Sequence, residues 1–212
     1  MQRRAFSTAA LSLTAATALG IPAVASAQAS AFREGTDFRR LRRPAPVDAP
    51  AGQIEVLEFF AYTCIHCHNF VPVFKEWSKT VGSDVVIRHV PVGFNASFEP
   101  LQRLYYTLEA MGRVESHHER VFQAIHVDRQ RLNTPDAMAQ WAERNGLDKA
   151  QFTQVFNSFA VAGRARRATQ LQDAYEVEAT PSVGVAGRFI IGGQAARTVL
   201  VANALINEAR RG

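Results

Sequence analysis

One stretch of the sequence, from Ile54 to Phe70, limits the folds open to this chain more than any other. Residues 54–60 form a nearly unbroken apolar run rich in β-forming residues, which predicts a strand buried on both faces. The sequence CIHC follows at residues 64–67, and apolar residues then recur at helical spacing: Phe70, Val71, Phe74 and Trp77. The stretch therefore predicts a central strand followed by a helix, with two cysteines at the start of the helix.

That position favours thiol chemistry. The thiolate is the reactive form of cysteine, and a helix N-terminus offers unpaired amides and the positive end of the helix dipole. Cys64, the outer cysteine, is predicted to be the acidic nucleophile. Cys67 lies one turn further on and is predicted to be deeper, so that it can resolve a mixed disulfide by closing the ring. His66, between them, adds a donor or a positive charge near the Cys64 sulfur.

The cysteine count favours a redox role over a structural one. Both cysteines of the chain lie in the CIHC sequence. A structural disulfide is the alternative, but closing so short a loop stabilises a fold by only about 2 kcal/mol in the chain-entropy model. A CxxC pair beside a βαβ pattern is typical of thioredoxin-like redox proteins. We therefore expect Cys64 and Cys67 to form a redox-active disulfide.

The rest of the pattern predicts an α/β protein. Strands are expected at 37–42 and 84–92, helices throughout 99–176, a hairpin turning at 186–188, and a closing helix at 195–210. Thr134, Pro135 and Gly146 mark the ends of one helix in the helical block. This order predicts a thioredoxin fold, a central mixed β-sheet flanked by helices, with an inserted all-helical subdomain. The expected divisions are 1–28, a removed signal peptide; 29–98 and 177–212, the thioredoxin-like domain; and 99–176, the insertion.

The N-terminal 28 residues have the pattern of an export signal. Arg3 and Arg4 precede a modestly apolar stretch, and Ala25-Ser26-Ala27 is a small-residue cleavage site. The arginine pair is compatible with either the twin-arginine or the general secretory route. Removing this segment leaves 22 basic and 19 acidic residues, and the formal charge falls from +5 to +3. The remaining charge is too small to indicate nucleic-acid binding.

Several features together resemble the DsbA family of thiol:disulfide oxidoreductases. These features are VLEFFAYTCIHC with its strand glutamate Glu58, the Cys-x-His-Cys pair, the end of the helical block at 157–161, and Thr180-Pro181 before the hairpin. The resemblance covers essentially the whole mature chain. Two positions differ from the common family pattern, which has proline at the place of Ile65 and often valine at the place of Thr180.

The resemblance implies a periplasmic, monomeric oxidase of a Gram-negative bacterium that needs no metal or organic cofactor. Its disulfide would be donated to unfolded exported polypeptides with free cysteines, and a DsbB-like membrane quinone reductase would reoxidise it. Glu58 would relay a proton for Cys67. Thr180 and a cis Pro181 would bind substrate beside Ile65. The structural alternative for Glu58 is that it points to an edge of the sheet or pairs with a basic residue such as Lys75.

Other functions remain open from the sequence. Residues 64–68 read CIHCH, the attachment pattern of c-type haem, for which Met111 or Met138 could supply an axial ligand. A metal-binding or chaperone module would use the two cysteines with His66 and His68. A disulfide isomerase is also possible, although fewer than thirty residues separate the cleavage site from Glu55, too few for the dimerisation domain of DsbC-type isomerases. No metal-ligand spacing unites the remaining histidines, and they receive no predicted role: His89, His117, His118 and His126.

Overall fold

The computed structural model describes residues 32–212, so the predicted signal peptide and its cleavage site lie outside the described residues. The strands are β1 (Arg39–Arg40), β2 (Ile54–Phe60), β3 (Val85–Pro91), β4 (Ser182–Val185) and β5 (Phe189–Gly192). The helices are α1 (Ile65–Ser78), the 3-10 helix η1 (Ala96–Phe98), α2 (Glu99–Ala110), α3 (Val114–His126), α4 (Pro135–Arg144), α5 (Lys149–Phe156), α6 (Phe159–Ala174) and α7 (Ala196–Arg210). This order confirms the predicted α/β thioredoxin fold.

The five strands form one mixed sheet in the order β1-β5-β4-β2-β3. β2 pairs in parallel with β3 and antiparallel with β4, so the strand that leads to the cysteines lies inside the sheet, as its apolar sequence predicted. β3 forms an edge, where Pro91, which has no amide hydrogen to donate, is tolerated at the strand end.

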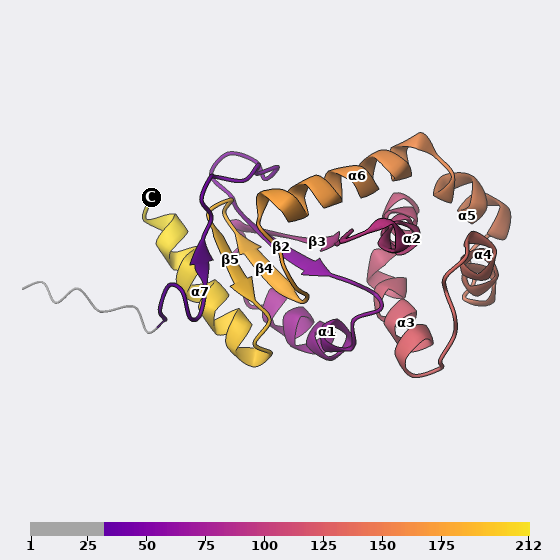
Figure 1. Ribbon diagram of the computed structural model, residues 1–212, viewed down its shortest axis with the longest axis horizontal. Helices are drawn as coiled ribbons and strands as arrows, with labels where there is room; N and C mark the ends of the chain where they lie inside the picture. Colours follow the sequence, from indigo (N-terminus) through magenta and orange to yellow (C-terminus); the bar gives the residue numbers. More distant parts are fainter. Residues whose placement is uncertain (1–31) are drawn as a thin grey trace, which may run out of the picture.

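Helices cover both faces of the sheet (Figure 1). α1 and α7 lie on one face, and α6 crosses the other, while α2 to α5 gather beyond the edge formed by β3. Side chains of β2 alternate between the two faces. Val56 packs with Phe74 of α1 and Leu205 of α7, whereas Phe59 packs against Tyr175 at the end of α6. This alternation makes β2 the centre of two hydrophobic cores.

The first strand is the main difference from the predicted secondary structure. A strand was expected at 37–42, but only Arg39 and Arg40 are in β1. The residues before them form a turn in which the Gly35 amide donates to the Phe38 carbonyl. After them, the chain continues alongside the β4–β5 hairpin through single hydrogen bonds, such as that from the Leu41 amide to the Arg188 carbonyl. The predicted strand was therefore too long, because this hydrophilic segment at the edge of the sheet pairs regularly with β5 at only two positions, Arg39 and Arg40.

Within residues 32–212, no helix is long and apolar enough to cross a membrane.

Candidate active site

Cys64 is the N-cap residue of α1. Its backbone is extended, with φ −86° and ψ 114°, and its sulfur accepts a hydrogen bond from the Cys67 amide at 3.4 Å. Cys64 is half-buried, whereas Cys67 has no exposed surface. The structure contains both as free thiols. The predicted arrangement, an outer cysteine at a helix N-terminus and a deeper one a turn later, is confirmed.

The two thiols have opposite acidities. Burial raises the pKa of Cys64, but hydrogen bonding with the Thr180 side chain, with Cys67 and with the His66 amide outweighs burial, so this pKa lies below its usual value. Burial raises the pKa of Cys67 far above its usual value, and the hydrogen bond at the Ala61 backbone offsets only part of that effect. At neutral pH the reactive thiolate is therefore favoured at Cys64.

The Thr180–Pro181 peptide bond is cis and lies beside the cysteines, which confirms the prediction made for it. The Cys64 thiol donates to the Thr180 carbonyl at 3.4 Å. The loop after β5 packs closely on this proline: a Cβ atom on Gly193 would stand 2.5 Å from the Pro181 carbonyl oxygen. Glycine is therefore needed at position 193 for the loop to hold the cis-proline segment against α1.

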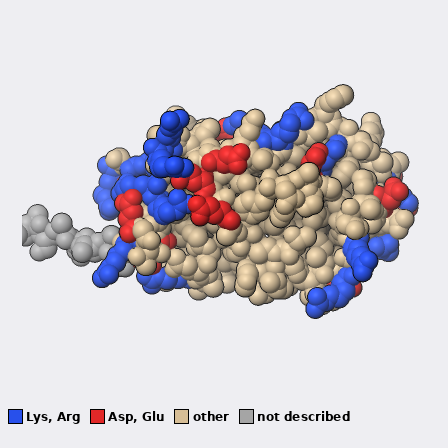
Figure 2. Space-filling view, in the orientation of Figure 1, with Lys and Arg blue, Asp and Glu red and all other residues tan. Residues whose placement is uncertain are grey.

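A cavity of about 340 Å³ opens at this place. Its lining includes His66 and Asn69 of α1, together with Thr180, Pro181 and Gly193. Ile65 is 47% exposed on the outer side of the helix N-terminus. The middle of the face shown in Figure 2 carries few charged side chains, whereas charges gather near both ends of the molecule. The cysteines therefore have a cavity beside them that lies between the first turns of α1 and the Thr180–Pro181 segment, and none of the described residues that line it is an acid, a lysine or an arginine.

His66 is exposed, and the structure modifies the role expected for it. Among the described contacts, its amide lowers the Cys64 pKa, but its imidazole makes no hydrogen bond to the sulfur. His68 behaves differently: its ring stacks on His126 at 5.2 Å between centroids, and burial, with His126 as the second cause, lowers its pKa. Cys67 is buried and His68 is packed in this stack, an arrangement unlike an exposed attachment site for haem.

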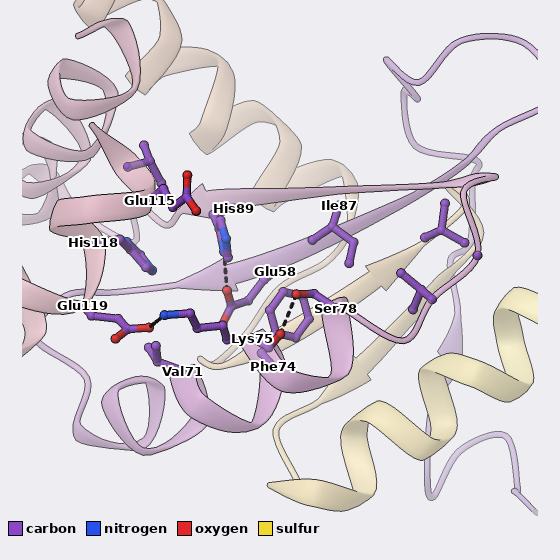
Figure 3. Close-up of a pocket in the computed structure, with 14 residues that line it drawn as sticks. Glu58, Val71, Phe74, Lys75, Ser78, Ile87, His89, Glu115, His118 and Glu119 are labelled. Carbon is purple, nitrogen blue, oxygen red and sulfur yellow. Dashed lines mark hydrogen bonds and ion pairs between the residues drawn. The ribbon is translucent and has the colours of Figure 1, made fainter. Parts of the chain in front are cut away.

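Glu58 lies on the face of β2 that is covered by α1, and it is only 2% exposed. Lys75, the example given of a basic partner, instead pairs with Glu119 at 2.6 Å, so Lys75 was the wrong partner. The partner of Glu58 is His89 of β3, whose Nδ1 lies 2.5 Å from Glu58 Oε2 (Figure 3). The parallel pairing of β2 and β3 places the two residues opposite each other.

His118 of α3 approaches the same pair. Its ring centroid is 5.0 Å from that of His89, and its Nδ1 shares a 2.9 Å hydrogen bond with the Tyr62 hydroxyl. Burial, with His89 as a second cause, holds the pKa of His118 well below its usual value. The prediction gave His89 and His118 no role, because β3 and α3 meet Glu58 only in the folded chain and the sequence spacing contains no sign of it.

A second buried carboxylate, Glu55, shows how Glu58 differs from a structural ion. Glu55 is 1% exposed, accepts from Arg88 at 2.8 Å and also accepts from the Asp48 amide. A permanently charged guanidinium and a backbone donor therefore offset part of the effect of burial, which still raises the pKa of Glu55. Among the described residues, Glu58 has only an imidazole within hydrogen-bond distance. A single imidazole therefore partners the buried carboxylate of Glu58, whereas two donors, one of them a guanidinium, partner that of Glu55.

A dithiol at a helix N-terminus, next to a cis-proline on a thioredoxin fold, defines a thiol:disulfide oxidoreductase of the thioredoxin class. The comparisons with known proteins agree. Residues 86–202 match the family model described as a DSBA-like thioredoxin domain. The thiol:disulfide interchange protein DsbA of Bordetella pertussis is 42% identical over 94% of this chain and 96% of its own length. The DsbA of Pseudomonas aeruginosa is 37% identical over the same shares.

Solved structures give the same result. The crystal structure of Pseudomonas aeruginosa DsbA matches 85% of this chain and 95% of its own with a TM-score of 0.81 and 34% identity. That of DsbA from Xylella fastidiosa matches 85% and 99% with a TM-score of 0.80 and 28% identity. The chain belongs to the DsbA family, and it is a disulfide oxidoreductase. The family in general acts on substrate proteins and depends on a membrane reoxidant.

Proposed function

We propose that this protein is a monomeric periplasmic oxidase that donates the Cys64–Cys67 disulfide to unfolded exported polypeptides. A substrate thiolate attacks the Cys64 sulfur, the Cys64–Cys67 bond breaks, and Cys67 leaves with the electron pair. A second substrate thiolate then attacks the substrate sulfur of the mixed disulfide and releases Cys64 as a thiolate. The substrate is oxidised by two electrons and the protein is reduced by two. The observation that carries this proposal is the opposite acidity of the two thiols.

Each neighbouring residue has a role in this proposal. Cys67, which is buried and a weak acid, must take up a proton after it leaves, and Glu58, buried on the face of β2 that α1 covers, relays that proton. The cis segment Thr180-Pro181 and the exposed Ile65 bind the substrate backbone beside Cys64. A strand added there would use peptide hydrogen bonds, which are independent of sequence and suit unfolded chains of many kinds.

The remaining parts of the proposal concern location and partners. Export depends on the predicted signal peptide at 1–28. In the proposed domain organisation, 29–98 and 177–212 form the thioredoxin-like domain and 99–176 is the helical insertion. A DsbB-like quinone reductase in the membrane reoxidises the dithiol. No nucleic acid takes part. The reaction uses the two sulfurs alone, so the proposal includes no organic cofactor.

Equilibration of the purified protein with glutathione tests the proposed direction of the reaction. Stabilising the Cys64 thiolate stabilises the reduced protein, so its disulfide is expected to be reduced at glutathione ratios that leave structural disulfides, with potentials below about −300 mV, intact. Catalysed oxidation of a dithiol peptide by the oxidised protein should accompany this result. A disulfide that resists glutathione and fails to oxidise the peptide would contradict the oxidase proposal.

Replacement of His66 by alanine is expected to make the protein less oxidising. The imidazole adds a polar group with an N–H donor at the exposed side of the helix N-terminus, while the amide contribution to Cys64 is retained in the variant. We expect the equilibrium constant with glutathione to change threefold to tenfold, which is about 15 to 30 mV. Asn69→Ala is the matched control, since Asn69 lines the same cavity. Equal potentials for wild type and His66→Ala would eliminate this role.

A further inference from the structure

A second groove lies on the other side of α1 from the cavity beside Pro181, and it is not part of the proposed substrate-binding surface. It has a volume of about 630 Å³ and lies between α1, β3 and α3. Glu58, His89 and His118 all line this groove, and one potential ligand atom from each lies within 4.8 Å of the other two. Figure 3 shows the three side chains converging from β2, β3 and α3.

Each of the three side chains is held by the fold. Glu58 is almost completely buried, so its carboxylate cannot turn away into bulk water. His89 already lies at hydrogen-bond distance from it. The Tyr62 hydroxyl binds Nδ1 of His118 and leaves Nε2 of that ring as the remaining ligand atom. A hydrogen bond to the second ring nitrogen is the usual way in which proteins orient a metal-binding histidine.

The donor set selects the kind of ligand. Two imidazole nitrogens and one carboxylate oxygen suit Zn²⁺ and its neighbours in the first transition row, and they leave one position of a tetrahedron open. Bonds of about 2.0–2.1 Å would draw the ligand atoms to roughly 3.3 Å from each other. The groove has space for a water molecule or a small anion at the open position. Its other charged groups are Glu115, Glu119 and Lys75, and the Lys75–Glu119 ion pair leaves a net negative charge.

We propose that Glu58, His89 and His118 form a binding site for one divalent cation of the zinc class. The bound cation would lie between Glu58 and His89 and replace their hydrogen bond, so the hydrogen bond and the bound cation cannot be present together. If Glu58 relays protons for Cys67, the cation also slows disulfide exchange; this consequence, unlike the site, rests on the proposed function.

The test uses the oxidised protein without a polyhistidine tag, because reduced Cys64 and Cys67 would themselves bind the metal. Titration with Co²⁺, followed by its visible d–d absorption, is expected to show one tightly bound ion per chain that Zn²⁺ displaces. His89→Gln and His118→Gln are each expected to weaken binding at least about 100-fold, since even the loss of an outer partner of a ligand costs 10-fold to 100-fold. His89 is half-buried, so its variant provides the test if His118→Gln does not fold.

The matched control is His117→Gln. His117 is adjacent to His118 on α3 and is equally buried, but it contacts Ser116 and the Asn145 carbonyl instead of the groove. We expect this variant to bind Co²⁺ like wild type. Failure of the oxidised wild type to bind Co²⁺ or Zn²⁺, or unchanged binding by folded His89→Gln, would overturn the site. Exchange measured in the presence of a chelator tests the oxidase function separately, so the two proposals can fail independently.

Discussion

Cys67→Ser, when reduced and mixed with a disulfide-bonded peptide, is expected to accumulate one covalent peptide adduct per chain, whereas Cys64→Ser forms almost none. Cys64 is half-buried and its pKa lies below the usual value, so it attacks the peptide disulfide. Without Cys67, the resulting mixed disulfide has no neighbouring thiol to resolve it. In the wild type, Cys67 can attack the Cys64 sulfur of any adduct and release the peptide, so the adduct does not accumulate.

The two variants distinguish the nucleophilic thiol from the resolving thiol, because each variant keeps only one of the two cysteines. In Cys64→Ser the remaining thiol has no exposed surface and a pKa far above its usual value, so its adduct should form at least about 100-fold more slowly. Mass spectrometry of samples quenched with acid measures both rates. Comparable rates for the two variants would mean that burial and acidity do not distinguish the thiols, and the assignment of Cys64 as nucleophile would be abandoned.

The elements built from local pattern were predictable. The buried strand at 54–60, the helix after the CIHC sequence and the hairpin before the closing helix follow from periodicity and from turn residues, and the structure has β2, α1, β4, β5 and α7 at these places. Thr134 was expected to cap its helix, and its hydroxyl accepts from the Ala137 amide. The short β1 was not predictable in length, because its end depends on pairing with β5, about 150 residues later.

The site was predictable only where its parts are adjacent in sequence. Cys64, Cys67 and their helix N-terminus belong to one segment, and the cis-proline was found through resemblance to a family. The partner of Glu58 was not predictable, since its choice between Lys75 and His89 depends on the register between β2 and β3. His118 joins them only through the packing of α3 against α1, a contact between segments about fifty positions apart.

The reduced protein is expected to melt at a higher temperature than the oxidised protein near neutral pH, the reverse of an ordinary structural disulfide. The folded-state pKa of Cys64 lies below the value of about 8.5 that the thiol has in an unfolded chain. An acid of this kind stabilises the fold fully above its unfolded pKa, and the contribution is lost as pH falls through the lower folded value. Oxidation removes the thiolate, and the disulfide that replaces it closes a short loop and stabilises the fold by only about 2 kcal/mol.

Cys67 limits the pH range in which the reduced protein is more stable than the oxidised protein. Its folded pKa is raised, so above pH about 8.5 the unfolded chain releases a proton that the folded chain keeps, and the reduced fold loses stability as pH rises further. The melting temperature of the reduced form relative to the oxidised form should therefore rise from mildly acidic pH, be greatest near pH 8, and decline in more alkaline solution.

Melting both redox forms from about pH 5 to pH 10 measures this curve. A difference of 2–4 °C corresponds to about 1 kcal/mol for a chain of this size, so a stabilisation of that order is detectable. Cys64→Ala, which retains Cys67 and cannot form the disulfide, is the control: its melting temperature, compared with that of the oxidised wild type at each pH, should show no rise below pH 8 but should keep the alkaline decline. The rise and the decline belong to different thiols, so a curve that kept its rise in Cys64→Ala would assign the stabilising charge to another group. An oxidised form that melts higher at every pH would mean that Cys64–Cys67 is a structural disulfide, and the proposed oxidase chemistry would lose its thermodynamic basis.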